Sequence, residues 1–194
     1  MEKKKEKTFE ERFEMLMTSF EKLRESQAET AKSMQELSTE STKTEKAIQA
    51  LKEEVTGIAK SNGMVAEETI FNSLNKDMIF GGVKFDEIER NIKLKSKMLN
   101  LQGEYDIVLT NGDTIAIIEA KWRVRPEDIT KLATKQVANF RNLFPMFADY
   151  KIMLGIGGMG FEGDAEDIAK ASGVGVIKVI GNKAEYYTEG IRLY

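Results

Sequence analysis

Residues 103–121 read Gly103-Glu-Tyr-Asp-Ile-Val-Leu-Thr-Asn-Gly-Asp-Thr-Ile-Ala-Ile-Ile-Glu-Ala-Lys121. Two apolar runs, 105–110 and 114–120, flank Asn111-Gly112, the strongest short-range signal for a β-hairpin. A two-residue turn there pairs Thr110 with Asp113. We therefore expect Asp106 to lie opposite Ile117, and Glu104 to lie opposite Glu119.

Four charged side chains of this hairpin are expected on one side of the sheet. Opposed residues share a face, and so do residues two apart on one strand, which groups Glu104, Asp106, Glu119 and Lys121. Asp106 and Glu119 become diagonal neighbours, with their Cα atoms about 7–8 Å apart. Both carboxylates can then reach one cation. A turn one residue longer would place them on opposite faces.

Clustered carboxylates repel one another unless a cation neutralises them. Mg²⁺ or Mn²⁺ prefers oxygen ligands, activates a bound water and neutralises charge on a scissile phosphate. The ammonium group of Lys121 can orient that water. The alternative is that Glu104, Asp106, Glu119 and Lys121 are solvated residues on an open sheet face, and the spacing by itself leaves both interpretations open.

The composition of the chain narrows the possible chemistry. The 194 residues include no cysteine and no histidine, which excludes disulfides, zinc-thiolate sites and Ser-His-Asp catalysis. Catalysis therefore has to use carboxylates, lysine, tyrosine, hydroxyls or a metal with oxygen ligands. No apolar run approaches the length of a membrane span, and no signal peptide is recognised, so we expect a cytoplasmic protein without a membrane partner. The net charge of −3 provides no overall attraction for nucleic acid.

The N-terminal third has the pattern of a coiled coil. Residues 1–62 contain no proline and one glycine. Apolar residues recur at alternating steps of four and three, which predicts self-association through residues 9–62. β-branched residues at a and leucine at d over 48–58 favour a parallel dimer. We expect Gly63 to end this stalk, giving domains 1–62 and 63–194. The seam contains Phe9, Phe13, Leu16, Phe20, Leu23, Met34, Leu37, Ile48, Leu51, Val55 and Ile58.

The remaining segments predict an α/β fold with a mixed sheet. The expected helices are 65–74, 127–144 and 164–172. Further strands are expected at 78–85, 92–101, 150–156, 174–180 and 184–187.

The hairpin also carries a resemblance to a known family. Asp106, followed after twelve residues by Glu119-Ala-Lys121, resembles the D…(D/E)-x-K motif of the PD-(D/E)XK nuclease superfamily, which has the restriction-endonuclease-like fold. The resemblance covers roughly residues 63–180 and implies an αβββαβ core. It implies that Asp106 and Glu119 bind Mg²⁺ or Mn²⁺ and that Lys121 positions the nucleophilic water. Glu67, on the preceding helix, would complete the metal site, with Glu68 as the alternative.

Other polar residues near the motif have both functional and structural interpretations. Gln136 matches a position that some members of the superfamily place beside the metal, although an exposed helix glutamine is also common. Trp122, Arg123 and Arg125 offer a stacking surface and phosphate contacts, or pack and face solvent. Lys131 and Lys135 extend a basic track or lie on a solvated helix face.

A glycine motif competes with this assignment. Gly155-Ile-Gly-Gly-Met-Gly160 satisfies G-x-G-x-x-G, the dinucleotide-binding pattern. Only 34 residues follow it, too few for the rest of such a domain, so we expect a flexible connection from strand to helix.

The sequence thus predicts a dimeric, metal-dependent nuclease that hydrolyses DNA phosphodiester bonds. The alternative is an inactive adaptor with the nuclease fold, whose coiled coil binds a protein or nucleic-acid partner.

Overall fold

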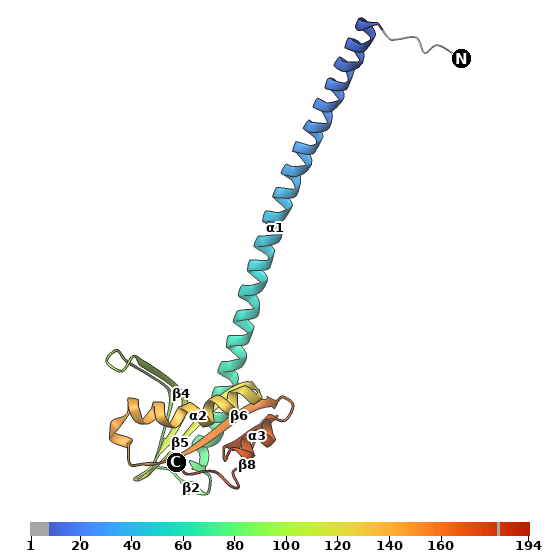
Figure 1. Ribbon diagram of the computed structural model, residues 1–194. Helices are drawn as coiled ribbons and strands as arrows, with labels where there is room; N and C mark the ends of the chain where they lie inside the picture. Colours follow the sequence, from blue (N-terminus) through green and yellow to red (C-terminus); the bar gives the residue numbers. More distant parts are fainter. Residues whose placement is uncertain (1–7, 182) are drawn as a thin grey trace, which may run out of the picture. The chain divides into compact units, whose positions relative to one another are not determined.

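The computed structural model describes residues 8–181 and 183–194. The chain forms two units, the first ending at Gly57 and the second comprising Ile58–Tyr194. One long helix, α1 (Phe9–Asp77), contributes residues to both units (Figure 1). Residues 1–7 of the expected stalk lie outside the described residues. None of the described helices combines the length and apolar character needed to span a bilayer.

The expectation that Gly63 ends the stalk helix is wrong. A glycine inside a helix costs about 1 kcal/mol relative to alanine, but it keeps its backbone N–H and does not interrupt the hydrogen bonds. The helix continues because Ala66, Ile70 and Leu74 are buried in the second unit. It ends at Asp77, because the next residue, Met78, has a left-handed φ of 52°; the Met78 N–H still donates to the Leu74 carbonyl at 2.8 Å.

In the first unit, the expected seam is a row of exposed apolar side chains. From Phe9 to Val55, each apolar seam residue is more than half exposed. A helix this long in a single copy therefore leaves its apolar stripe in solvent.

The second unit contains a six-stranded mixed sheet in the order β3-β4-β5-β6-β7-β8. Strands β3, β4 and β5 are antiparallel, β6 and β7 continue parallel to β5, and β8 is antiparallel to β7. The bounds are β3 Glu87–Ser96, β4 Leu101–Thr110, β5 Thr114–Val124, β6 Lys151–Phe161, β7 Gly175–Ile180 and β8 Lys183–Tyr187.

Two expected strands are wrong because each contains a turn. The segment 78–85 is a small hairpin of β1 (Ile79–Phe80) and β2 (Val83–Lys84), with positive φ at both intervening glycines. The segment 92–101 runs through the turn between β3 and β4, where Asn100 has a φ of 47°. Asparagine tolerates this conformation, which a period-two pattern does not reveal.

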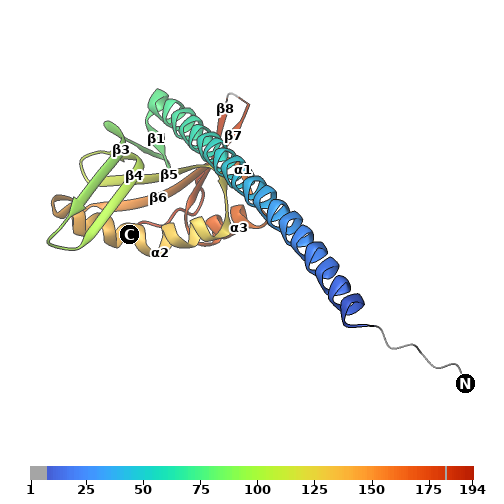
Figure 2. The ribbon, with the colours of Figure 1, turned by 90° about the horizontal axis from the view of Figure 1, so that it is seen from above.

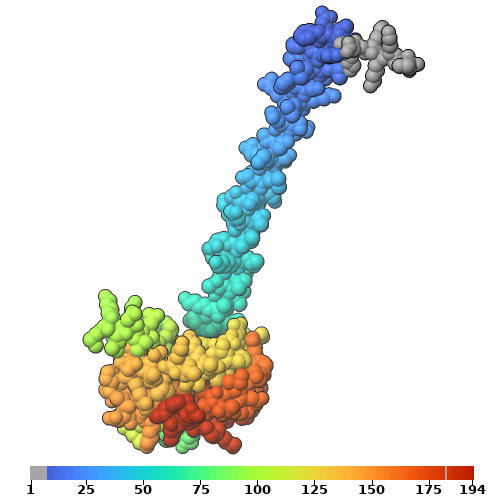
Figure 3. All heavy atoms as spheres, in the orientation of Figure 1, coloured from blue at the N-terminus to red at the C-terminus, as the bar shows by residue number. Residues whose placement is uncertain are grey.

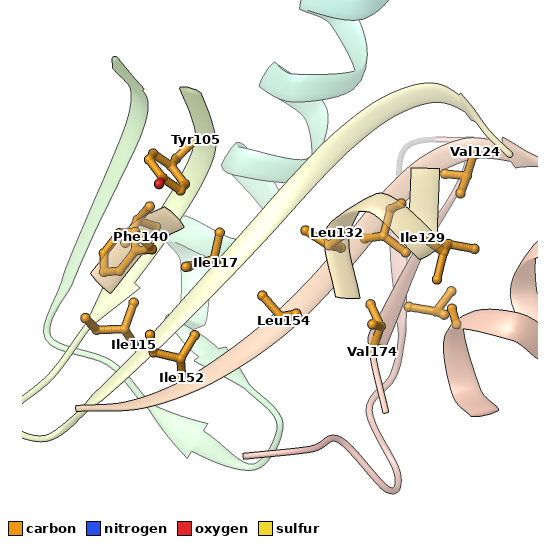
Figure 4. Packing of buried hydrophobic residues seen from close by; sticks show 14 of the residues in the cluster. Tyr105, Ile115, Ile117, Val124, Ile129, Leu132, Phe140, Ile152, Leu154 and Val174 are labelled. Atoms are coloured by element: carbon orange, nitrogen blue, oxygen red, sulfur yellow. The ribbon is translucent and has the colours of Figure 1, made fainter. Parts of the chain in front are cut away.

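Helices cover both faces of the sheet (Figure 2). The last turns of α1 place Ile70 and Leu74 on the face that contains Ile107 and Ile118. Helix α2 (Pro126–Leu143) and α3 (Ala165–Ala171) cover the other face, and a short 3₁₀ helix, η1 (Pro145–Phe147), follows α2. Figure 4 shows this second layer, in which Ile129, Leu132 and Phe140 of α2 meet Ile115, Ile117, Ile152 and Leu154 of the sheet.

The glycine motif lies inside β6, not in a flexible connection as expected. Gly155 pairs with Gly175 of β7, and a Cβ on either glycine would lie 2.6 Å from Cζ of Phe80. A Cβ on Gly157 would lie 2.6 Å from Ile70. These glycines let α1 and Phe80 approach the sheet closely. A strand interior also provides no loop that could surround a phosphate.

We expect Gly155→Ala to destabilise the protein by about 1–3 kcal/mol, because the new methyl group overlaps the rigid Phe80 ring. The melting temperature should fall by about 3–10 °C in a circular dichroism melt. Gly160→Ala is the matched control in the same strand, since a Cβ there meets nothing within 4 Å. Equal melting temperatures for the two variants would contradict the close packing.

Candidate functional site

The turn between β4 and β5 differs from the expected two-residue turn. Thr110 pairs with Ile115, not with Asp113, so the expected pairs Asp106–Ile117 and Glu104–Glu119 are wrong. A type I′ turn needs positive φ at both central residues, and neither Asn111 nor Gly112 has one. The Asn111 side chain instead accepts the Thr114 N–H at 3.0 Å. The partner of each β4 residue moves by two positions, an even shift that leaves every side chain on its expected face.

Strands β4 and β5 separate near the motif. Their last pair is Ile107 with Ile118. Beyond it, β4 pairs only with β3, and β5 pairs only with β6. Across this gap, Asp106 Oδ2 accepts a hydrogen bond of 2.8 Å from the backbone N–H of Ala120. A side-chain oxygen thus satisfies a buried donor that a continued ladder would have paired with a carbonyl.

The separation opens a cleft of about 700 Å³ between the strands and α2. The five residues that the resemblance implies for the active site all line it: Glu67, Asp106, Glu119, Lys121 and Gln136. They come from α1, β4, β5 and α2. Tertiary structure therefore brings together residues up to 69 positions apart in the chain.

A second cleft of about 520 Å³ adjoins the first, and Glu67, Lys93, Glu104 and Asp106 line both. Glu68 lines only this second cleft. It is also exposed, whereas Glu67 is partly buried. Of the two helix carboxylates that the sequence left open, Glu67 is therefore the one beside Asp106 and Glu119.

Asp106 is a buried acid, with 8% of its surface exposed. Burial raises its pKa to about 7, and the charge of Glu119 contributes in the same direction. The Ala120 hydrogen bond and Lys121 lower the pKa, whereas Glu67 raises it slightly. Near neutral pH the cleft therefore holds a carboxylate whose negative charge the chain compensates only in part.

Lys121 compensates part of this charge. Its Nζ lies 2.6 Å from Glu119 Oε1. Burial lowers the pKa of Lys121, but Glu119, Asp106 and Asp128 together raise it above its ordinary value. The ammonium group is therefore charged at neutral pH.

The oxygen ligands available here suit a hard divalent cation. Asp106 and Glu119 lie on the two separating strands, and Glu67, Glu104 and Asp128 are the other acidic residues of the same cleft. Within residues 8–181 and 183–194, no three acidic side chains are arranged as a ready-made metal site. Mg²⁺ commonly uses only one or two carboxylates and completes its coordination with water and substrate phosphate. The partly uncompensated charge of Asp106 fits such an ion.

The arginines after the motif lie outside the cleft. Arg123 Nη1 and Arg125 Nε approach Glu162 at 3.5 and 3.7 Å, and the side chains are mostly exposed. Trp122 is 41% exposed and does not line the cleft. Lys131 lines it, whereas Lys135 does not.

Further polar residues line the cleft without having been singled out in the sequence: Lys93, Lys95, Gln102, Asp128 and Asn139. Asp128 also accepts the Arg125 backbone N–H at 3.0 Å and so caps α2. Helical periodicity contained a signal for two of them, because 128, 132, 136 and 139 follow steps of four, four and three. Lys93 and Lys95 had no such signal, because the strand expected at 92–101 does not match β3, which is Glu87–Ser96.

We expect Asp106→Asn to stabilise the metal-free protein by about 1–3 kcal/mol at pH 8. The folded pKa of Asp106, about 7, exceeds its unfolded value of 3.8. Well below pH 3.8 the acid is protonated in both states; its burial penalty grows as the pH rises from there to 7 and then stays constant. Urea melts in EDTA at pH 4 and pH 8 measure the difference.

The control for this experiment is Asp86→Asn, because Asp86 is exposed. Its effect should be small and should not change between the two pH values. A stabilisation by Asp106→Asn that is equal at pH 4 and pH 8 would contradict the buried charge.

Comparisons with known proteins add nothing to this geometry. No model of a protein family, no curated protein and no solved structure matches the chain. The function proposed below therefore rests on the cleft and on the sequence motif that lines it.

Proposed function

We propose that this protein is a metal-dependent nuclease that hydrolyses DNA phosphodiester bonds. The observation that carries the proposal is the meeting of Asp106, Glu119 and Lys121 in one cleft, with Glu67 and Gln136 beside them. The D…(D/E)-x-K motif requires two carboxylates and a charged lysine beside one another, and Asp106, Glu119 and Lys121 line the same cleft. DNA as the substrate follows from the resemblance to the nuclease superfamily.

The fold supports a restriction-endonuclease-like core. The end of α1 is followed by three antiparallel strands, β3 to β5, and then by α2 and the parallel strand β6. This order matches the αβββαβ arrangement that the resemblance implies, if the small β1–β2 hairpin is an insertion.

In this proposal Asp106 and Glu119 hold Mg²⁺ or Mn²⁺, and Glu67 assists them. The bound ion supplies charge neutralisation at the phosphate and a more acidic water. The Ala120 N–H fixes the Asp106 carboxylate through its hydrogen bond to Oδ2. The carboxylate therefore keeps its orientation when the substrate enters.

Lys121 and Gln136 act on the water and the phosphate. Glu119 holds the Lys121 ammonium at 2.6 Å, and the other two N–H groups of that ammonium can orient the attacking water or neutralise a phosphate oxygen. Gln136, on α2, can donate its amide N–H to the same groups. Proximity and fixed charge are thus the contributions of the chain itself.

The exposed seam of α1 supports a dimer, which we include in the proposal. Each apolar seam residue from Phe9 to Val55 is more than half exposed, and a second copy with the same stripe would bury these side chains. A parallel dimer brings two nuclease domains to the same end of the coiled coil, as cutting both strands of a duplex requires.

The alternative function is that of an inactive adaptor with the same fold. The observation in its favour is the net charge of −3, which gives no overall attraction to DNA. In that case the coiled coil would bind another protein and the cleft would have no substrate. Metal binding separates the two functions, because an adaptor has no need of it.

Glu119→Ala is expected to reduce Mg²⁺- or Mn²⁺-dependent cleavage of DNA by at least about 100-fold, since it removes a metal ligand and the partner of Lys121. Cleavage of single-stranded, duplex and branched DNA should be followed on gels. The matched pair Glu67→Gln and Glu68→Gln tests the helix carboxylate, and only the former should reduce the rate.

Mn²⁺ binding, followed by calorimetry, provides the second measurement. The wild type should bind the ion, and Asp106→Ala and Glu119→Ala should lose it. A wild type that neither cleaves any of the three substrates nor binds Mn²⁺ would overturn the nuclease proposal and favour the adaptor.

The double variant Ile48→Asp/Leu51→Asp is expected to be monomeric in light scattering after size exclusion, because a dimer would have to bury the new carboxylates at its seam. Gln49→Asp, between the two seam positions, is the control and should stay dimeric. A monomeric wild type would refute the coiled coil.

Strand orientation is read from a single introduced cysteine, since the chain has none of its own. Ile48→Cys should form a disulfide-linked dimer on oxidation if the helices are parallel, because identical seam positions then face each other. In an antiparallel pair centred on the seam, position 48 faces a distant part of the partner, and no such dimer forms.

A further inference from the structure

The hairpin of β3 and β4 extends beyond the rest of the sheet as a two-stranded arm, defined here as residues 92–105. Over this range each strand pairs only with the other, and β5 pairs with β4 from Ile107 onward. Figure 3 shows the tip of the arm, in light green, standing out from the other residues of the second unit. Its tip residues Met98 and Leu99 are 89% and 49% exposed.

The arm is basic in an acidic protein. It contains Lys93, Lys95 and Lys97 and one acidic residue, Glu104, in a chain whose net charge is −3. Lys93 forms an ion pair with Glu104. Within the described residues, Lys95 and Lys97 form no ion pair and are exposed. The two positive charges toward the tip are therefore available to an anionic partner.

These lysines lead away from the cleft. Lys93 and Lys95 both line it, and as residues two apart on β3 they share a face. Lys97 follows at the start of the turn. Lys93 and Lys95, two apart on β3, are separated by about 6.8 Å, which equals the rise of two phosphates along one strand of B-DNA at about 3.4 Å each.

We propose that the arm binds the phosphate backbone of duplex DNA from the rim of the cleft outward, with Lys95 and Lys97 contacting phosphates and Met98 at the tip contacting sugars or bases. The inference rests on the proposed nuclease function, since it concerns the substrate of the same site. The arm supplies the positive charge that the composition as a whole lacks. An exposed apolar side chain beside lysines is a combination that proteins use to enter a DNA groove.

The test measures the affinity of full-length protein for a fluorescein-labelled 30-base-pair duplex by anisotropy, in EDTA and at KCl concentrations from 50 to 200 mM. Lys95→Ala/Lys97→Ala should weaken binding about tenfold and reduce the slope of log affinity against log salt by about 2, because two phosphate contacts are lost. The control Lys76→Ala/Lys84→Ala removes the same charge from exposed positions outside the arm and should change neither quantity.

Met98→Ala should weaken binding without changing the salt slope, because an apolar contact releases no counterions. An unchanged affinity would overturn the contact assigned to the tip. Melting curves of all variants are expected to match that of the wild type, since the altered side chains are exposed.

The proposal for the arm is overturned if Lys95→Ala/Lys97→Ala binds like the wild type, if the control loses as much affinity, or if the wild type does not bind the duplex. The nuclease function is tested separately, by cleavage of DNA in Mg²⁺ or Mn²⁺. Binding that depends on the arm, without cleavage and without Mn²⁺ binding, would support the arm and refute the nuclease. Cleavage by the wild type, together with unchanged DNA binding by Lys95→Ala/Lys97→Ala, would support the nuclease and refute the arm.

Discussion

The separation of β4 from β5 after the pair Ile107–Ile118 is the constraint on which the site depends. A strand pair that ends early leaves backbone donors without partners, and a buried unpaired N–H destabilises the fold. The Asp106 carboxylate accepts the N–H of Ala120 and so stabilises the opening from inside. The same residue thereby holds the gap open and lines the cleft that the gap creates. A continuous ladder would have filled this space with paired backbone.

Close packing on both sides of the sheet fixes the two walls of the cleft. On one side, the glycines of β6 and β7 admit Phe80 and Ile70 near the sheet, which brings the last turns of α1 and Glu67 to the level of the strands. On the other side, Ile129, Leu132 and Phe140 anchor α2. Asp128, Gln136 and Asn139 of that helix consequently face the cleft. The acidic and amide groups are held by apolar contacts that have no part in the chemistry.

The charges of the second unit are distributed unevenly. Acidic groups gather where the strands separate, and burial raises the pKa of Asp106 to about 7. Lysines occupy the arm and the rim of the cleft. A divalent cation and a phosphate backbone would complement these two regions respectively. A net charge averaged over the whole chain hides this division.

The sequence by itself determined the long helix, the alternation of β4 and β5, the amphipathic α2 and the face shared by Asp106, Glu119 and Lys121. Each follows from local periodicity, which short-range sterics and burial impose. The longer turn after Thr110 left the shared face intact only because the shift in register was even. Tertiary structure alone decided that α1 continues through Gly63, because the burial of Ile70 and Leu74 outweighs the cost of one glycine. It also decided that Glu67 rather than Glu68 faces the motif, that the glycine motif is a strand, and that β3 and β4 form an arm, since these outcomes depend on contacts between segments far apart in the chain.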